Sequence, residues 1–345
     1  GRTRGGQGYV TTFACLIFAA LVGSAVAACA ALGAMLIPMM VSSGYNREES
    51  SALVASANLV APIMPPSVPM IVYGVSAGVS INSMFMAGIA PAVYLTIVAC
   101  VVWFFRSHRK GVVPTTEHFV PPTPKEALRI FGGGIWALLL PVIILVGLHS
   151  GKFTATEAGV IACVYALLIG LLVYRELKIK NLGKVFVNAA KTSAVVMFLA
   201  AAANVAAYYM TVSRIPQILT GGLEGLVENR TLLMIVLMLI VIVVGLAMDV
   251  TPSILILTPI MIPLVEAAGI NKVYFGVCFV LMNVLGLTSP PVGPVLNVAC
   301  AAGNVKMDKI IGPTMPYFIS QTILCFALAI FPFLVEVPMG WFGAS

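Results

Sequence analysis

Asp249 is an acidic residue set between two long apolar runs of this 345-residue chain. It lies in the stretch Met-Asp-Val-Thr-Pro-Ser, between 232–248 and 253–268, whereas most other acidic residues fall in polar stretches or at segment ends. An acidic side chain at membrane depth is costly, and such residues usually serve ion or substrate binding. Asp, Thr and Ser also cap helices well. Both interpretations remain open, and the functional one is favoured.

Three further polar residues lie within apolar segments. Ser24 follows Gly23 in the middle of the run 9–41, where it could bind an ion, cap a helix or bond to its own helix. Asn58 and Asn283 could line a site or hydrogen-bond between helices. Carbonyls freed at a helix break, together with Ser and Thr hydroxyls, are hard oxygen ligands suited to Na⁺, and half-helix N-termini suit a carboxylate.

The chain aligns with itself, without a gap, at an offset of 225 residues. In so apolar a chain, chance matches of Leu or Ala are expected, but matches of several prolines and asparagines in one register are not. The matched pairs are Pro38 with Pro263, Asn46 with Asn271, Asn58 with Asn283, Pro65-Pro66 with Pro290-Pro291, Pro69 with Pro294, and Pro91 with Pro316. Ser24 meets Asp249 in this register. The sequence therefore contains an internal repeat.

The composition places these residues in a membrane. Apolar residues make up 60% of the chain and charged residues 9%, with a mean hydropathy of +1.06, whereas soluble domains have about 25% charged residues. This excludes soluble enzymes, nucleic-acid binders and disordered proteins. The net charge of +7 is then better explained by basic cytoplasmic loops than by a nucleic-acid partner. The chain has room for roughly ten to twelve passes or partial passes.

Four apolar segments are interrupted. The run 9–41 breaks at Gly23-Ser24 and 232–268 at 249–253, and their short arms favour re-entrant hairpins. The runs 53–78 and 274–303 break at 62–67 and 288–293, and their double prolines forbid continuous helices. The ordinary spans are 84–105, 130–148, 155–174, 193–212 and 311–335. The linker 175–184 could begin an amphipathic surface helix.

The expected fold class is an all-α polytopic membrane protein with inverted repeats, each holding a re-entrant hairpin and a broken helix. Five crossings separate the two hairpins, and an odd number inverts the second repeat. On this topology, fifteen Lys and Arg lie on the Gly1 side and four on the other, which places Gly1 in the cytoplasm and Ser345 on the outer side of the membrane. The expected parts are a first repeat at 9–106, scaffold spans and cytoplasmic linkers at 107–212, and a second repeat at 213–336.

Other chemistries lack a motif. The chain has no G-x-x-x-x-G-K-[ST] loop for ATP, and its seven cysteines and three histidines form no CxxC pair or cluster that would bind a transition metal. Inverted repeats with paired broken helices are typical of secondary transporters. The alternatives are an intramembrane enzyme, which would need a second acid or a Ser–His/Lys dyad, and a passive anion channel.

Four motifs in order resemble the large membrane subunit of tripartite ATP-independent periplasmic (TRAP) transporters. They are GSAVAACAALGAMLIPMMVSSGY, APIMPPSVPMIVYG with SINSMFMAGIAP, MDVTPSILILTPIMIPLVEAAGI and GLTSPPVGPVLNVA. The resemblance covers nearly the whole chain, although family members usually carry about three further N-terminal segments. It implies an elevator-type fold and a transporter, not an enzyme. The implied activity is Na⁺-coupled uptake of organic acids through the bacterial inner membrane. The implied partners are a small four-helix membrane subunit (separate or fused upstream) and a periplasmic substrate-binding protein.

The same resemblance implies two or more Na⁺ ions and no organic cofactor. One Na⁺ site would lie between the Ser24 tip and the first break, and a second between the Asp249 tip and the second break. The implied ligands are Ser24, Ala61, Met64 and Pro66 at the first site, Asp249, Thr251, Thr288, Ser289 and Gly293 at the second, with Ser67, Asn58 and Asn283 at the substrate. Asp249 stands where many members carry Glu, and Thr288-Ser289 replaces the commoner Ile-Thr. The stretch around Asp249 leans toward members that handle sialic acid or sugar acids, with C4-dicarboxylates as another possible cargo.

Overall fold

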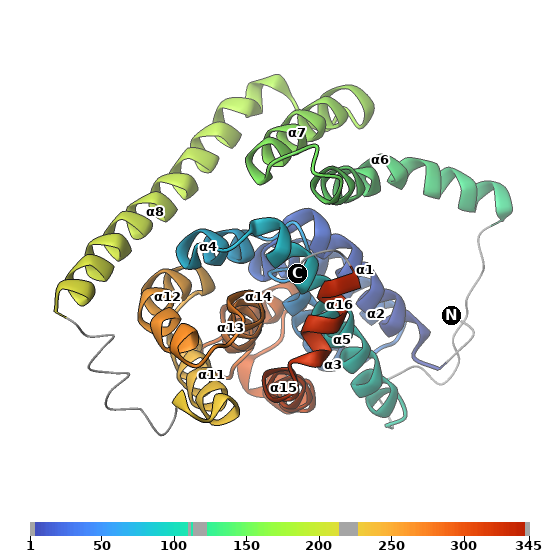
Figure 1. The fold of residues 1–345 in the computed structure, drawn as a ribbon. Helices are drawn as coiled ribbons and strands as arrows, with labels where there is room; N and C mark the ends of the chain where they lie inside the picture. The colour runs from blue at the N-terminus through green and yellow to red at the C-terminus, as the bar shows by residue number, and fades with distance from the viewer. Residues whose placement is uncertain (1–3, 110–111, 113–122, 214–226, 342–345) are drawn as a thin grey trace. The chain divides into compact units, whose positions relative to one another are not determined.

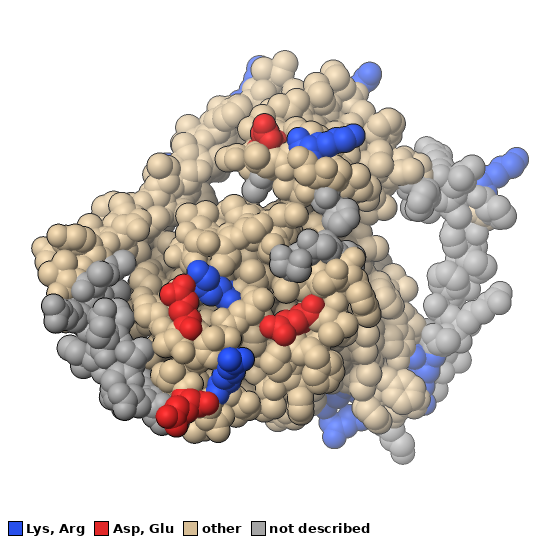
Figure 2. Space-filling view, viewed as in Figure 1, with Lys and Arg blue, Asp and Glu red and all other residues tan. Residues whose placement is uncertain are grey.

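The structure is a computed structural model that describes residues 4–109, 112, 123–213 and 227–341 (Figure 1). The chain divides into two compact units, residues 1–120 with 219–345 and residues 121–218. Every regular element in the described ranges is helical, and seven of these helices are long and apolar enough to cross a membrane. The face drawn in Figure 2 carries only a few scattered charged groups. The expectation of an all-α polytopic membrane protein is confirmed.

The first unit contains both copies of the repeat. The first copy comprises α1 (Gly6–Val22), α2 (Ala25–Ser42), α3 (Arg47–Ala57), the 3₁₀ turn η1 (Asn58–Val60), α4 (Val68–Ala77) and α5 (Ile81–Ser107). The second comprises α11 (Arg230–Ala247), α12 (Val250–Ala267), α13 (Lys272–Gly286), α14 (Pro294–Gly303), α15 (Met307–Ile330) and α16 (Phe333–Trp341). Both α12 and α13 begin 225 positions after α2 and α3, as the sequence offset predicts.

The first hairpin turns at Gly23 and Ser24. Gly23 has a φ of 64°, a left-handed conformation that favours glycine, and its N–H bonds to the Ala19 carbonyl at 3.1 Å. The predicted interruption at 249–253 is wrong in extent, because only Met248 and Asp249 lie outside the helices. Pro252 falls in the first turn of α12, where its missing N–H and fixed φ do not disrupt a helix.

Both broken helices have gaps that begin one residue before the predicted ones and end where predicted. The first gap is residues 61–67, between η1 and α4, and the second is residues 287–293, between α13 and α14. Each contains a double proline, Pro65-Pro66 and Pro290-Pro291, and both proline–proline bonds are cis. Proline supplies no N–H to the helix and clashes with the preceding turn.

The two repeats pack reciprocally. The second arm of each hairpin lies against the second half of the other repeat's broken helix, so α2 packs on α14 and α12 on α4. The Arg47 guanidinium donates to the Gly303 carbonyl at 2.9 Å, and the Tyr73 hydroxyl donates to the Lys272 carbonyl at 2.8 Å. Arg47 and Lys272 are equivalent positions, the first residues of α3 and α13. Each bond therefore joins the start of one repeat's broken helix to the second half of the other's. A two-fold relation between the copies produces this pattern.

The second unit consists of α6 (Pro124–His149), α7 (Ala155–Leu168), the π-helical turn η2 (Ile169–Val173) and α8 (Ile179–Val212). Thr154 and Glu157 form a capping box at α7, with the Thr154 N–H bonded to the Glu157 carboxylate at 2.8 Å. A helix does begin in the linker 175–184, at Ile179, and it continues without a break as α8 to Val212. The last span also ends earlier than predicted, at Ile330, since the next residue, Phe331, precedes Pro332 and is disfavoured in a helix.

A buried ion pair joins the outer ends of α3 and α5. Glu49 is only 6% exposed and accepts from both Nε (3.0 Å) and Nη2 of Arg106. Glu49→Leu leaves the arginine charge buried without its partner, so we expect a loss of about 3 kcal/mol of stability, measured by thermal unfolding of the purified protein in detergent. The double variant Glu49→Leu/Arg106→Leu should recover most of this loss. An unchanged melting temperature in the single variant would contradict the expectation.

Candidate functional site

The first hairpin tip lies directly against the first helix break. A Cβ atom placed on Gly23 would lie 2.9 Å from the Pro66 carbonyl oxygen and 3.6 Å from the Ser67 Cα. Only a glycine therefore allows this approach without displacing backbone. The turn η1, at the start of the break, also contacts α1 and α2. The structure thus brings together the two elements that the sequence assigned to the first ion site.

The first break leaves backbone oxygens free. Its internal bonds end on the carbonyls of Asn58, Val60 and Pro62. Among the described residues, no donor reaches the carbonyls of Ala61, Met64 and Pro66, the three ligands that the family resemblance implies here. Ala61 is fully buried, and the other two are half-buried. An unpaired buried carbonyl carries a desolvation penalty that a bound cation or water would relieve.

Two serines act as helix caps around this break. Ser24 Oγ accepts from the Ala27 N–H at 3.4 Å, at the start of α2. Ser67 is fully buried, accepts from the Met70 N–H at 3.3 Å and donates its hydroxyl proton to the Pro62 carbonyl. A hydroxyl oxygen has two acceptor lone pairs. Each serine oxygen therefore keeps acceptor capacity for a further ligand while it caps its helix.

The second break is lined by two buried hydroxyls. Thr288 donates to the Leu285 carbonyl at 3.2 Å and Ser289 to the Gly286 carbonyl at 2.7 Å, so both oxygens present lone pairs as acceptors. Gly293 is buried, caps α14 and bonds through its N–H to the Ser289 carbonyl at 2.8 Å. This loop offers oxygens of the kind that hard cations prefer.

Asp249 caps α12, with its Oδ1 accepting the Val250 N–H at 2.8 Å. Its side chain is exposed, and Thr251 is half-buried one residue into the helix. The capping interpretation is confirmed. The second hairpin packs tightly against the second broken helix one turn earlier, where a Cβ on Gly286 would lie 2.1 Å from the Gly245 carbonyl oxygen. Within the described ranges, no hydrogen bond links Asp249 to residues 288–293.

The two repeat-related asparagines are completely buried and incompletely paired. Asn58 donates through Nδ2 to the Val54 carbonyl at 2.8 Å, but its Oδ1 has no partner. Neither the amide nitrogen nor the amide oxygen of Asn283 has a partner. Burying an unpaired amide costs about 1–3 kcal/mol per group. A ligand or ordered water that bonds to these atoms would offset that cost.

Thr258 is a candidate that the motifs did not indicate. It lies on α12, is fully buried and has no partner for its hydroxyl, whereas a helical threonine normally bonds to its own backbone. The alignment of the two repeats could have indicated this residue, because Thr258 aligns with Gly33 at the offset of 225. The second hairpin therefore has a hydroxyl at a position where the first has none. In the part of the chain that the structure describes, no group of three His, Cys, Asp or Glu side chains could hold a metal ion.

Comparison with known proteins agrees with this architecture. The family model of the tripartite ATP-independent periplasmic transporter, DctM component, matches residues 1–334. A Haemophilus influenzae protein provisionally named as a TRAP transporter large permease is 46% identical over 341 residues, covering 99% of this chain and 79% of that protein. The 2,3-diketo-L-gulonate TRAP transporter large permease protein of Escherichia coli is 42% identical over the same shares of both chains.

A more distant relative bears on the predicted branch. The sialic acid TRAP transporter large permease protein of Vibrio cholerae is 29% identical over 332 residues, covering 96% of this chain and 77% of that protein. The match to the family model spans both repeats and the second unit. Together with the paired hairpins and broken helices, these matches show that the chain belongs to the DctM family, the large membrane permeases of TRAP transporters.

Proposed function

We propose that this permease moves an organic acid into the cell together with Na⁺ ions, without ATP. The observation that carries the proposal is the set of unpaired carbonyls of Ala61, Met64 and Pro66 beside the Gly23–Ser24 tip. Carbonyl and hydroxyl oxygens at unwound helix breaks are the usual Na⁺ ligands of secondary transporters. Inward movement of each Na⁺ releases about 2.3 kcal/mol per 100 mV of membrane potential.

The first Na⁺ site combines these carbonyls with Ser24. The second uses the oxygens of Thr288 and Ser289 and the loop that ends at Gly293, with Asp249 and Thr251 at the neighbouring tip. Because Asp249 is exposed and already caps α12, its contribution here is long-range attraction of the cation or direct ligation after the tip closes. The two sites then use opposite repeats, which would couple at least two ions to one transport cycle.

The substrate is a sugar-derived carboxylate, held between the two Na⁺ sites near Ser67, Asn58 and Asn283. Asn283 offers both an amide donor and an acceptor with no protein partner, which suits a polyhydroxylated acid. The N-termini of α2, α4, α12 and α14 at the tips and breaks favour a carboxylate. The relative named for 2,3-diketo-L-gulonate is 42% identical, against 31% for the one named for C4-dicarboxylates and 29% for sialic acid, which supports a sugar acid.

The transport cycle is of the elevator type in the bacterial inner membrane, with Gly1 in the cytoplasm and Ser345 in the periplasm. The repeats at 9–106 and 213–336 supply the moving hairpins and broken helices, and the spans at 107–212 belong to the scaffold. A periplasmic binding protein delivers the substrate, and a small membrane subunit completes the tripartite transporter. A relative named isethionate TRAP transporter permease protein DctMQ matches 99% of this chain over 53% of its own length, which leaves room there for a fused subunit.

The test is uptake of radiolabelled 2,3-diketo-L-gulonate into proteoliposomes that hold the permease and its small subunit, with the binding protein outside. We expect uptake that needs both an inward Na⁺ gradient and the binding protein, with K⁺ unable to replace Na⁺. Uptake driven equally by K⁺ or without any gradient would refute Na⁺ coupling. Uptake of another organic acid under the same requirements would correct the substrate alone.

Asp249→Asn separates the two roles of this residue. Asparagine caps helices as well as aspartate, so we expect an unchanged melting temperature but an increase of about tenfold in the Na⁺ concentration for half-maximal uptake, from loss of the charge. Asp249→Ala should also lose about 1 kcal/mol of stability with the cap. If Asp249→Asn keeps the Na⁺ dependence of the parent protein, Asp249 has no part in the second site.

A further inference from the structure

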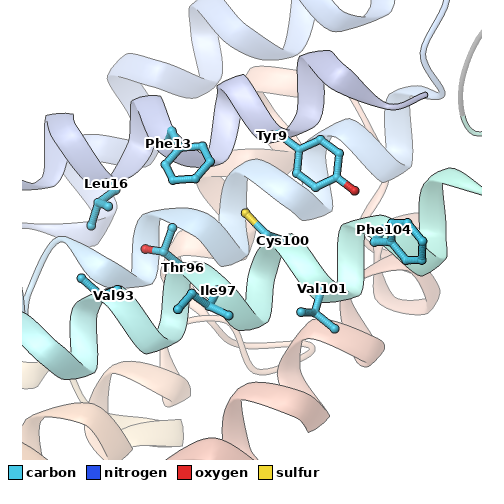
Figure 3. A pocket seen from close by; sticks show the side chains of 9 residues that line it. All are labelled: Tyr9, Phe13, Leu16, Val93, Thr96, Ile97, Cys100, Val101 and Phe104. Carbon is cyan, nitrogen blue, oxygen red and sulfur yellow. The ribbon is translucent and has the colours of Figure 1, made fainter. Parts of the chain in front are cut away.

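An open groove runs between α1 and α5 on the surface of the first unit (Figure 3). Phe13 and Leu16 line it from α1, and Val93, Ile97 and Val101 line it from α5. Phe13 and Ile97 are each 53% exposed. Thr96 also faces the groove, but its hydroxyl donates to the Ala92 carbonyl of its own helix at 2.9 Å. The groove therefore offers almost only hydrocarbon to whatever fills it.

The length of the groove matches one leaflet of a bilayer. Its α5 wall extends from Val93 to Phe104, which is about 16 Å at the rise of an α-helix. This is about half of the roughly 30 Å hydrocarbon core. No charged residue occurs in 9–22 or 81–105. A single acyl chain would fill the groove from the mid-plane to one membrane surface.

Among the described residues of α1, α5 and their ends, the basic side chains lie beyond the Tyr9–Phe104 end of the groove. There the Arg4 side chain is exposed and donates through Nε to the Ser107 carbonyl at 3.2 Å, and Arg109 is exposed two residues further along the chain. The ring of His108 lies 4.6 Å from that of Phe104. Figure 3 shows the Tyr9 hydroxyl at this same end, where tyrosines commonly meet the lipid headgroups.

The charges at this end favour an anion. Arg106 is turned inward and bound to Glu49, so that pair contributes no net charge. Guanidinium groups form paired hydrogen bonds with phosphate, and basic clusters at the membrane surface attract anionic lipids. We propose that the groove between α1 and α5 binds an anionic phospholipid, with one acyl chain along Phe13 and Ile97 and its phosphate at Arg4 and Arg109. This site depends on the membrane location of the chain and not on Na⁺ coupling.

Tryptophan quenching tests the site in the intact transporter. Phe13→Trp places a fluorophore in the groove, and the exposed native tryptophans are replaced in the same protein (Trp136→Phe and Trp341→Phe), which leaves only the buried Trp103 as background. The protein is reconstituted in phosphatidylcholine with added dibrominated phosphatidylglycerol or dibrominated phosphatidylcholine. We expect half-maximal quenching at a lower mole fraction of the brominated phosphatidylglycerol than of the brominated phosphatidylcholine. The difference should be about fivefold for each arginine that contacts the phosphate. Arg109→Gln should reduce this preference by about fivefold, and Arg4→Gln/Arg109→Gln should remove it.

The matched control is Ile323→Trp, because Ile323 is 65% exposed and lies on α15, a helix that contains no arginine. Both brominated lipids should quench it equally. Three results would overturn the proposal: equal quenching of Trp at position 13 by both lipids, a preference that survives loss of both arginines, or no quenching by either lipid. The last would mean that protein covers the groove.

Discussion

Replacing Asn283 by leucine is expected to reduce uptake by about a hundredfold and to raise the stability of the protein. Asn283 is fully buried with both amide atoms unpaired, so the substitution removes a desolvation penalty of about 1–3 kcal/mol and breaks no internal hydrogen bond. The same amide is proposed to bind the substrate, and its loss would cost about 2–3 kcal/mol of binding to a charged ligand. Uptake assays and thermal unfolding in detergent measure the two effects.

Thr314→Val is the matched control, because Thr314 is also fully buried but its hydroxyl donates to the Ile310 carbonyl of its own helix at 2.8 Å. Uptake by this variant should stay within about twofold of the parent. If Asn283 only stabilises the fold, the leucine variant would melt at a lower temperature than the parent protein. Its uptake would then fall only as much as the amount of folded protein falls.

Gly286→Ala is expected to have the largest effect on stability and transport together. A Cβ at this position would lie 2.1 Å from the Gly245 carbonyl oxygen and 2.3 Å from its carbon. These are backbone atoms of α11, so no side chain can rotate away, and overpacking of this kind costs about 3 kcal/mol. Displacing α11 also moves the second hairpin tip, and a shift of about 1 Å at a binding site can lower a rate about a hundredfold.

Gly159→Ala provides the comparison, because nothing lies within 4 Å of a Cβ at that position in α7. Alanine in a helix interior should stabilise the protein by about 0.5–1 kcal/mol and leave uptake unchanged. If Gly286→Ala melts and transports like Gly159→Ala, the close contact between α11 and α13 is not needed in either state of the transporter.

The sequence by itself determined the features that depend on local chemistry. Composition required a membrane, because a surface with so few charges cannot face water. Prolines at 65–66 and 290–291 required breaks in two helices, since proline removes a donor and clashes with the turn before it. The offset of 225 residues predicted where the second set of helices begins, and α12 and α13 start at those positions.

Only the tertiary structure decided which groups meet and which remain unpaired. Residue types could not distinguish a break at 249–253 from a helix that admits Pro252 in its first turn. Nor could they show that the helix beginning in the linker 175–184 runs on to Val212 as α8. The pairing of α2 with α14, and the isolation of the Asn283 amide and the Thr258 hydroxyl, arise between segments far apart in the chain. Whether a buried polar atom finds a partner depends on packing around it, which spacing along the sequence does not specify.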